Sequence, residues 1–416
     1  MFAAGIANVE QYFSQLFADP DGNNDIFCAG RQMSSHFVTP TVDKNGNWLD
    51  LVNKKNTSAD MAPTAGQMPR ALGLALASKC FREAQQKNQS EHTHLSNQGN
   101  EICFCTIGDA STSEGHFWEA INAAGVLQVP LAVFVYDDGY GISVPIALQT
   151  TKGSISEVLK GFQKEKNTNG IKVYTVKGWD YAALCETFEE GIRYTRQTHT
   201  PVVFHVQELT QPQGHSTSGS HERYKPLERL EWERNWDCNK QMREWLIANE
   251  LATDEVLQEV ENEAKQLVRA DKLAAWEKYI SPIKEKIKEA VALVHQGLNE
   301  TDLNIANSFL QELVQSKEPL KRDIFRTVNL ILEKIPTHSN AAAIQSFLAK
   351  YNEVEAPFYS KHLYNEGPKS ALNVSVVEAE YATEAQTING YEVLNHYFDK
   401  LFEENPKVYA FGEDLG

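Results

Sequence analysis

Two short apolar runs that each end in an acidic turn constrain the fold of this chain more than any other feature. Residues 102–107 (ICFCTI) lead into Gly108 and Asp109, and residues 131–136 (LAVFVY) lead into residues 137–140 (DDGY). Apolar runs of this length, bounded by Gly and Asp, are typical of strands that are buried on both faces of a parallel sheet. We therefore expect an α/β fold in which both runs belong to one parallel sheet flanked by helices.

A helix is predicted between the two runs. Ser111 and Glu114 have the spacing of a capping box, which predicts that the helix begins at Ser111. Its buried stripe would consist of Phe117, Ile121, Ala124 and Leu127. A right-handed crossover through this helix would make the strands parallel and bring their carboxyl ends to the same edge of the sheet.

The acidic turns at that edge are the candidate site. Open parallel sheets bind ligands at the carboxyl ends of their strands, so Asp109 and Asp138 are expected to converge on one hard cation. The helix start at Ser111 would face a phosphate. The alternative is that these acids only form turns and cap helices, as Asp often does. Two acidic turns that close two strands of one unit favour the metal site.

These residues resemble the signature of a known family, the alpha subunits of the thiamine-diphosphate-dependent decarboxylating component of 2-oxoacid dehydrogenase complexes, most closely the branched-chain type. That signature is Gly-Asp-Gly, a helix, and Asn-Asn after a strand, and this chain has GDA at residues 108–110 and DD at residues 137–138. The resemblance implies a thiamine-diphosphate-binding fold in which Asp109, Asp138 and the backbone carbonyl of Tyr140 bind Mg²⁺. The other positions that it places at the cofactor here are Gly108, Ala110, Ser111 and Ile142.

Two departures from that signature have physical consequences. Asp138 stands where the family has Asn, which keeps an oxygen for a hard cation but adds a negative charge beside a diphosphate. Ala110 stands where the family has Gly, and its Cβ disfavours a positive φ, so the turn is expected to use an ordinary backbone region. Neither departure excludes the cofactor.

Two loops ahead of the first run also resemble the family, at residues 30–36 (GRQMSSH) and 62–69 (APTAGQMP). By this resemblance the Ala62 carbonyl and the Thr64 side chain would contact the middle of thiamine diphosphate. His36 would lie near the reacting carbon as a proton donor or a contact of the substrate carboxylate, because histidine is the usual proton-transfer residue near neutral pH. The alternatives are a purely structural histidine and a loop that only leads into a helix over residues 69–81.

A further strand is predicted at residues 201–206, followed by a loop rich in Ser, Thr and Gly over residues 207–225. Its position after a core strand favours an active-site lid over a solvent-exposed linker. The resemblance implies that His215 lies beside the diphosphate and the reacting centre, with Ser216, Thr217, Ser218 and Ser220 as hydroxyl donors. Many relatives have a phosphate-binding arginine just before that histidine, and this chain does not. His92 and His94, in a polar insertion, are expected to be exposed loop residues.

The chain divides by pattern into three parts. Residues 1–225 are expected to form the alpha-subunit-like cofactor-binding domain, residues 226–375 a helical C-terminal and linker region, and residues 376–416 the start of a beta-subunit-like domain. Helical periodicity is strongest over residues 228–249 and 254–268, whereas residues 276–351 are not assigned to the family. A helix from Ile388 and a strand over residues 408–411 resemble the opening of the beta subunit, in which Glu413 would activate the aminopyrimidine ring. On its own, Gly-Glu-Asp at that position would be an ordinary turn.

Composition limits the class of protein. The chain has 416 residues, of which 42% are hydrophobic, and a net charge of -17, which argues against nucleic-acid binding. No apolar run is long enough to cross a membrane, and no charged and then apolar signal opens the chain, so we expect a cytoplasmic location. The six cysteines lack metal-site spacing and are expected to be reduced packing residues.

The resemblance implies oxidative decarboxylation of a 2-oxo acid, with acyl transfer to a lipoyl-bearing dihydrolipoyl acyltransferase. A branched-chain substrate is expected, with pyruvate or acetoin dehydrogenase and a non-catalytic cofactor-binding fragment as alternatives. A homo-oligomer is expected if the chain is an alpha and beta fusion. Relatives have further segments before and after the part matched here, including a Tyr-Arg pair that holds the diphosphate, so this chain alone is expected to be weakly active or inactive.

Overall fold

The computed structural model of the protein describes residues 1–43, 45–59, 61–87, 95–215, 221–360, 363–365, 367–405 and 408–412. The chain forms two units, Met1–Tyr364 and Asn365–Gly416. Each unit is described by itself below.

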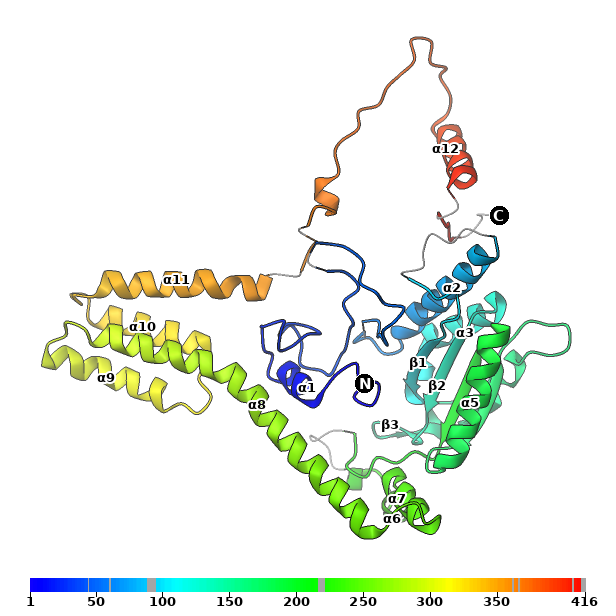
Figure 1. Ribbon diagram of the computed structural model, residues 1–416, viewed down its shortest axis with the longest axis horizontal. Coiled ribbons are helices and arrows are strands. Elements are labelled where there is room, and N and C mark those ends of the chain that lie inside the picture. The colour runs from blue at the N-terminus through cyan, green and yellow to red at the C-terminus, as the bar shows by residue number, and fades with distance from the viewer. Residues whose placement is uncertain are drawn as a thin grey trace. The chain divides into compact units, whose positions relative to one another are not determined.

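A four-stranded parallel sheet organises the first unit (Figure 1). Its strands are β1 (Cys103–Gly108), β2 (Leu131–Tyr136), β6 (Val202–Gln207) and β5 (Lys172–Lys177), in the order β1-β2-β6-β5. Every neighbouring pair is parallel. With helices packed on both faces, this arrangement confirms the α/β fold class, and β2 begins and ends where the sequence predicts.

Helices cover both faces of the sheet. On one face, α2 (Gln67–Gln86) and α3 (Gly115–Leu127) pack together, and Met68, Ile121 and Val133 lie in a shared apolar core. On the other face, α5 (Tyr181–Thr198) packs against β5, β6 and β2 over a cluster that includes the stacked rings of Phe134 and Phe204. Gly191 of α5 meets the Phe204 ring so closely that a Cβ would collide with it.

The prediction that both apolar runs are buried on both faces is correct for β2 and wrong for β1. All of residues 131–135 are buried, whereas the β1 side chain of Phe104 is 57% exposed. The reason is position, because β1 is at an edge of the sheet in the described part of the chain and α5 packs against the other three strands. One face of β1 therefore has only partial cover, from the stacked ring of Phe134.

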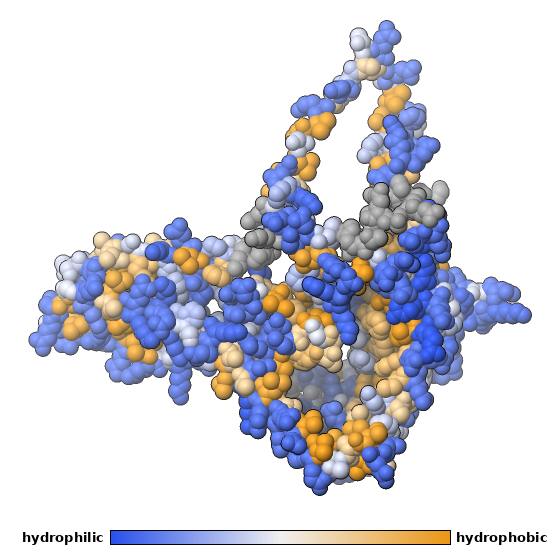
Figure 2. All heavy atoms as spheres, in the orientation of Figure 1, coloured by the Kyte–Doolittle hydropathy of each residue, from blue (hydrophilic) through white to orange (hydrophobic). Residues whose placement is uncertain are grey.

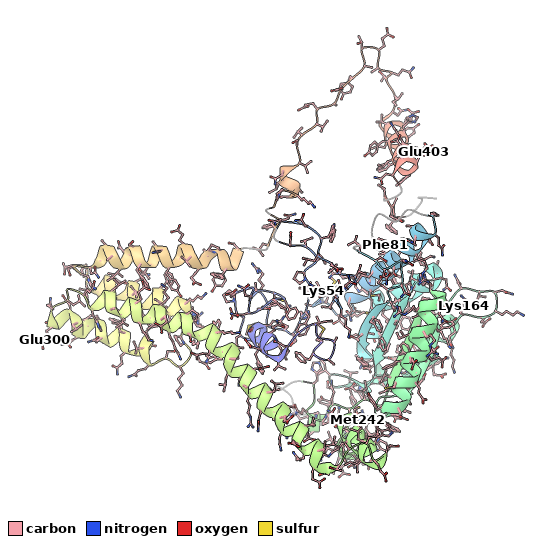
Figure 3. All side chains as sticks on the ribbon, in the orientation of Figure 1. Lys54, Phe81, Lys164, Met242, Glu300 and Glu403 are labelled. Atoms are coloured by element: carbon pink, nitrogen blue, oxygen red, sulfur yellow. The ribbon has the colours of Figure 1, made fainter. Side chains whose placement is uncertain are left out.

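The amino edge of the sheet is closed by polar contacts. The amine of Lys164, labelled in Figure 3, donates to the side-chain oxygen of Gln128 (2.7 Å) at the end of α3 and to the hydroxyl of Thr200 (3.3 Å) just before β6. These contacts join the loops that enter β2, β5 and β6. The turns that follow β1 and β2 lie at the opposite, carboxyl edge.

Short elements connect the larger ones. They are α1 (Val9–Leu16), η1 (Ala110–Ser113), β3 (Tyr140–Gly141), β4 (Val144–Pro145), η2 (Ile146–Leu148), η3 (Thr151–Gly153), α4 (Ile155–Val158), η4 (Leu159–Phe162), η5 (His221–Arg223) and, in the second unit, η6 (Ala371–Asn373). β3 and β4 pair as a small antiparallel ribbon.

The region after the lid is helical, as its periodicity predicts. It contains α6 (Leu227–Asn235), α7 (Cys238–Ala248), α8 (Asp254–His295), α9 (Glu300–Gln315), α10 (Lys321–Lys334) and α11 (Ala341–Ser360). The second half of α8 and helices α9 to α11 share a separate apolar core, which includes Ile283, Leu310, Ile331 and Phe347. Residues 276–351, which sequence patterns leave unassigned, thus form a small helical bundle. None of the helices in the described ranges is long and apolar enough to span a membrane.

The second unit contains one long helix, α12 (Gly390–Glu404), which opens with a capping box between Asn389 and Glu392. This confirms the helix expected after Ile388. Residues 374–388 are exposed, and hydrophilic and hydrophobic residues are mixed along them (Figure 2). The strand predicted over residues 408–411 is wrong, because this segment has no regular structure and no neighbouring strand to pair with in the described part of the unit.

Candidate functional site

The two acidic turns lie side by side at the carboxyl edge of the sheet. Gly108 pairs with Tyr136 in the register of β1 and β2, so Asp109 is level with Asp137. The backbone amide of Asp109 donates to the Tyr136 carbonyl (3.0 Å), which extends the ladder by one residue. The convergence expected from the strand ends is therefore present in the backbone.

Asp109 is the most unusual group of the site. Its side chain is buried, and Oδ2 has no hydrogen-bond partner in the described part of the chain. Burial, followed by the nearby charges of Asp137 and Asp138, raises the pKa of the Asp109 carboxyl to about 7. An unpartnered carboxylate oxygen in such a place is unfavourable by itself and suits a cation.

Asp137, by contrast, is fully engaged in the fold. Its Oδ2 lies 2.8 Å from Nε2 of His205 on β6, and its Oδ1 accepts from the backbone amide of Gly139 (2.8 Å). The other ring nitrogen of His205 lies 3.0 Å from the hydroxyl of Ser156 on α4. Asp137 therefore shapes the turn through both of its carboxylate oxygens.

Asp138 is half-buried and sits among charged groups. Its Oδ1 accepts from the backbone amide of Tyr140 (3.1 Å), and its backbone carbonyl accepts from the Arg229 guanidinium (2.6 Å). Burial raises the pKa of the Asp138 carboxyl, while the Tyr140 amide and the cations Lys225 and Arg229 act to lower it. Its environment is thus more polar than that of Asp109.

Tyr140 lies against the same cations. The Lys225 amine is 4.8 Å from the centre of the Tyr140 ring, and the Arg229 guanidinium is 5.5 Å from it. Lys225 and Arg229 both pair with the buried carboxylate of Glu233, at 2.7 and 2.9 Å. A network from the start of α6 therefore supports the turn from Asp138 to Tyr140.

The predicted capping box at Ser111 is wrong. Residues Ala110–Ser113 form the 3-10 turn η1, in which the Thr112 hydroxyl donates to the Asp109 carbonyl (2.5 Å). The helix α3 begins only at Gly115, with Glu114 in an extended conformation as its cap. The Thr112 hydroxyl donates to a carbonyl and does not accept from an amide as a capping hydroxyl would, and the first residues after Asp109 turn more tightly than a helix.

Ala110 adopts an ordinary backbone conformation, as predicted, since it is not among the described residues with positive φ. Its methyl group has a close neighbour, because a Cβ added to Gly141 would lie 2.8 Å from the Ala110 Cβ. Ile142 has a φ of 59°, a strained value for a β-branched residue, and its side chain is exposed. The ribbon of β3 and β4 thus presents a strained hydrophobic residue beside η1.

The upstream loops hold the other predicted positions. Ala62 and Thr64 are exposed in the loop that enters α2, and the Gln67 side chain ties the start of this helix to the Thr106 carbonyl (3.0 Å) on β1. The backbone carbonyl of His36 accepts from the side chains of Gln15 (2.5 Å) and Gln32 (3.2 Å), which fix its loop. The structure gives no contact of the His36 ring with the acidic turns.

The segment that the sequence predicts to be a lid is anchored at its start, and residues 216–220 lie outside the described residues. Glu208 accepts from the Trp179 indole (2.8 Å) and pairs with Lys177 on β5. His215 is exposed, while Ser216, Thr217, Ser218 and Ser220 lie outside the described residues. The buried imidazole of this segment is His221, whose Nδ1 has no partner in the described part.

Three further predicted positions, Glu413, His92 and His94, also lie outside the described residues.

Sequence reasoning missed His205, Lys225, Arg229 and Glu233. The spacing of Arg229 and Glu233, four residues apart on a helix, was the only available signal. In the described ranges no three His, Cys, Asp or Glu side chains are arranged to hold a metal.

Comparison with known proteins assigns the chain to a protein family. The family model described as the dehydrogenase E1 component matches residues 30–284, which include the sheet, both acidic turns and the lid. The chain belongs to the dehydrogenase E1 component family. Members of this family depend on thiamine diphosphate.

Individual relatives are distant. The chain is 24% identical over 203 residues to the protein named pyruvate dehydrogenase E1 component subunit alpha of Rickettsia bellii, an alignment of 49% of this chain and 55% of the relative. It is 26% identical over 315 residues to 2-oxoisovalerate dehydrogenase subunit alpha 1, mitochondrial, of Arabidopsis thaliana, covering 75% of this chain and 56% of the relative. The chain spans about half the length of the curated relatives it matches. Both names describe alpha subunits of 2-oxoacid dehydrogenases.

Proposed function

We propose that the carboxyl edge of the sheet binds thiamine diphosphate through Mg²⁺, as the alpha part of a decarboxylating 2-oxoacid dehydrogenase component. The observation that carries this proposal is the buried Asp109 carboxylate, whose Oδ2 has no partner in the described part and which lies beside the turn of Asp138. A hard cation would give that oxygen a ligand bond and offset the charge of both carboxylates. Family membership supports the identity of the cofactor.

The proposed ligands of Mg²⁺ are Asp109, Asp138 and the backbone carbonyl of Tyr140. The proposed cofactor contacts are Gly108, Ala110, Ser111, Ile142, Ala62, Thr64 and His215. His36 and His215 would hold or transfer a proton near the reacting carbon, and Glu413 would contact the aminopyrimidine. Bound thiamine diphosphate supplies the electron sink for the loss of carbon dioxide, and the protein supplies binding and orientation.

The proposed substrate is a branched-chain 2-oxo acid. Supporting this choice, the 2-oxoisovalerate relative aligns over 75% of this chain, against 49% for the pyruvate relative. Pyruvate or acetoin remains the alternative, since identity to both relatives is similar. The proposed partner is the lipoyl-bearing dihydrolipoyl acyltransferase that accepts the acyl group.

We also propose the domain division at residues 225 and 375 and a beta-subunit-like role for residues 376–416. The helix α12 with its capping box supports the last assignment, because it begins where the beta-like pattern begins. An alpha and beta fusion would assemble as a homo-oligomer. A cytoplasmic location is proposed on the sequence pattern alone.

The first experiment is calorimetric titration of the chain with thiamine diphosphate, with and without Mg²⁺. We expect binding that requires the metal, and equal binding without it would overturn the metal site. Turnover is then measured with 3-methyl-2-oxobutanoate and with pyruvate, using ferricyanide as the electron acceptor. Metal-dependent binding without ferricyanide reduction would identify a cofactor-binding chain that does not catalyse by itself.

A further inference from the structure

Two cations and a buried carboxylate surround the turn that carries Asp138. Arg229 donates to the Asp138 carbonyl (2.6 Å), and its side chain is about one quarter exposed (25%). Lys225 is almost wholly buried and pairs with Glu233, whose side chain is equally buried. A buried charged group is stable only when it is paired, so these contacts are a built part of the fold.

The charges of this group balance. Asp138 and Glu233 contribute two carboxylates, and Lys225 and Arg229 contribute two cations, so the four side chains together are neutral. Glu233 binds both cations through the same oxygen, Oε1, at 2.7 and 2.9 Å. It therefore holds the two cations beside Tyr140 and close to Asp138.

A diphosphate makes such a balance necessary. An unscreened carboxylate beside a metal attracts the cation but repels the diphosphate that must share it, and the two effects have opposite signs. With Asp109 and Asp138 both ionised, the edge would favour Mg²⁺ and disfavour the anionic cofactor. A neutralised Asp138 leaves Asp109 as the one uncompensated charge of the pair.

We propose that Arg229, held by Glu233 together with Lys225, is a positioning residue that offsets the charge of Asp138 and fixes its turn, so that this edge accepts a diphosphate as well as a cation. The inference rests on the proposed function, because it names how that same site tolerates an acidic ligand. It assigns Arg229, Lys225 and Glu233 to cofactor affinity and not to contact with the reacting atoms.

The test is a charge exchange in the whole chain, with R229Q, D138N and the R229Q/D138N double variant. R229Q removes a positive charge, D138N removes a negative one, and the double variant restores the balance. R229K is the matched control, because it keeps the charge while losing the planar fork. Lys225 still pairs with Glu233 in all of these variants, so the buried carboxylate keeps a partner and the chain is expected to fold.

Thiamine diphosphate is titrated at saturating Mg²⁺, and Mg²⁺ is titrated at saturating thiamine diphosphate. R229Q should weaken thiamine diphosphate binding roughly three- to tenfold without raising the Mg²⁺ concentration needed for half-saturation. The double variant should bind thiamine diphosphate within about twofold of the wild type, and R229K within about threefold. A merely structural role would weaken both titrations together, and a double variant no better than R229Q would overturn the proposal.

Urea unfolding without ligand separates this proposal from the proposed function. If the wild type shows no metal-dependent binding, the proposed function fails, and the charge pairing is then decided by stability. R229Q should destabilise the wild-type background more than the D138N background, because only the first retains the charge that Arg229 offsets. Equal effects in the two backgrounds would overturn the pairing.

Discussion

Nε2 of His205 lies 2.8 Å from Oδ2 of Asp137, across the boundary between β6 and the turn that follows β2. The His205 side chain is wholly buried, and its second ring nitrogen faces the Ser156 hydroxyl. Asp137 is thereby engaged within the fold, whereas the Asp138 side chain accepts only from the backbone amide of Tyr140 among the contacts of the described residues. Neighbouring aspartates in the same turn thus have different roles because of a partner on another strand.

Replacing His205 by Leu should destabilise the chain by about 2–4 kcal/mol, because a buried carboxylate oxygen loses its partner. Equilibrium unfolding in urea measures the change. Adding D137N to H205L should recover part of the loss, since an amide is less costly to leave unpaired than a carboxylate. A double variant as unstable as H205L would show that the packing of the ring, and not the pair, carries the stability.

Removing the charge of Asp109 should weaken metal-dependent binding of thiamine diphosphate without destabilising the fold. In D109N the side chain keeps its shape and loses its charge, so metal-dependent binding of thiamine diphosphate should fall by more than about 100-fold. The free energy of unfolding without ligand should rise at neutral pH, because Asn removes a buried charge whose burial and acidic neighbours raise the pKa of Asp109 to about 7. Calorimetry and urea unfolding give the two values. Retained binding in a folded D109N chain would remove Asp109 from the ligand set.

The sheet and the place of the site follow from local sequence, because short apolar runs that end in Gly and Asp carry their own boundaries. The capping box at Ser111 failed for a local reason, since the Thr112 hydroxyl closes a tighter turn on the Asp109 carbonyl. A four-residue pattern does not say whether the segment first forms a 3-10 turn, which moves the start of the helix to Gly115. The burial of β1 failed for a global reason, because an edge position depends on the order of all the strands.

The partners of the acidic turns were beyond sequence reasoning. His205 meets Asp137 only because β6 lies next to β2, with Val135 opposite His205 in the register. Sixty-eight residues separate the two partners along the chain, and no periodicity links them. Lys225 lies before α6 and meets Glu233 on that helix, so helical spacing alone points to the pair of Arg229 and Glu233 and not to the network.

The lowered pKa of His199, which follows α5, leads us to expect a loss of folding stability in mild acid. Burial, followed by the nearby charges of Arg82 and Lys79, lowers the pKa of its imidazole to about 4. Below its ordinary value of about 6.5 the unfolded chain takes up a proton that the folded chain does not, so stability falls as pH falls from about 6.5 to about 4. The contribution should be about 1–3 kcal/mol.

Urea unfolding at about pH 7.5, above that window, and at about pH 4.5, near its lower end, measures this effect. H199N is the matched control, because Asn tolerates the left-handed conformation of His199 (φ 55°) and does not titrate. The variant should lose less stability than the wild type between the two values. An equal loss in both proteins would assign the acid sensitivity to other groups.

The close approach of Gly141 to Ala110 predicts a coupling between the metal turn and the ribbon of β3 and β4. G141A would place its Cβ 2.8 Å from the Ala110 Cβ and against the flexible Gln149 side chain. The ribbon must then shift, and we expect a loss of about 1–3 kcal/mol, with weaker metal-dependent binding because Tyr140 precedes Gly141. A110G removes one of the two colliding methyl groups, so the G141A/A110G variant should recover much of both losses. If the double variant binds and unfolds like G141A, the Gln149 contact and not Ala110 sets the position of the ribbon.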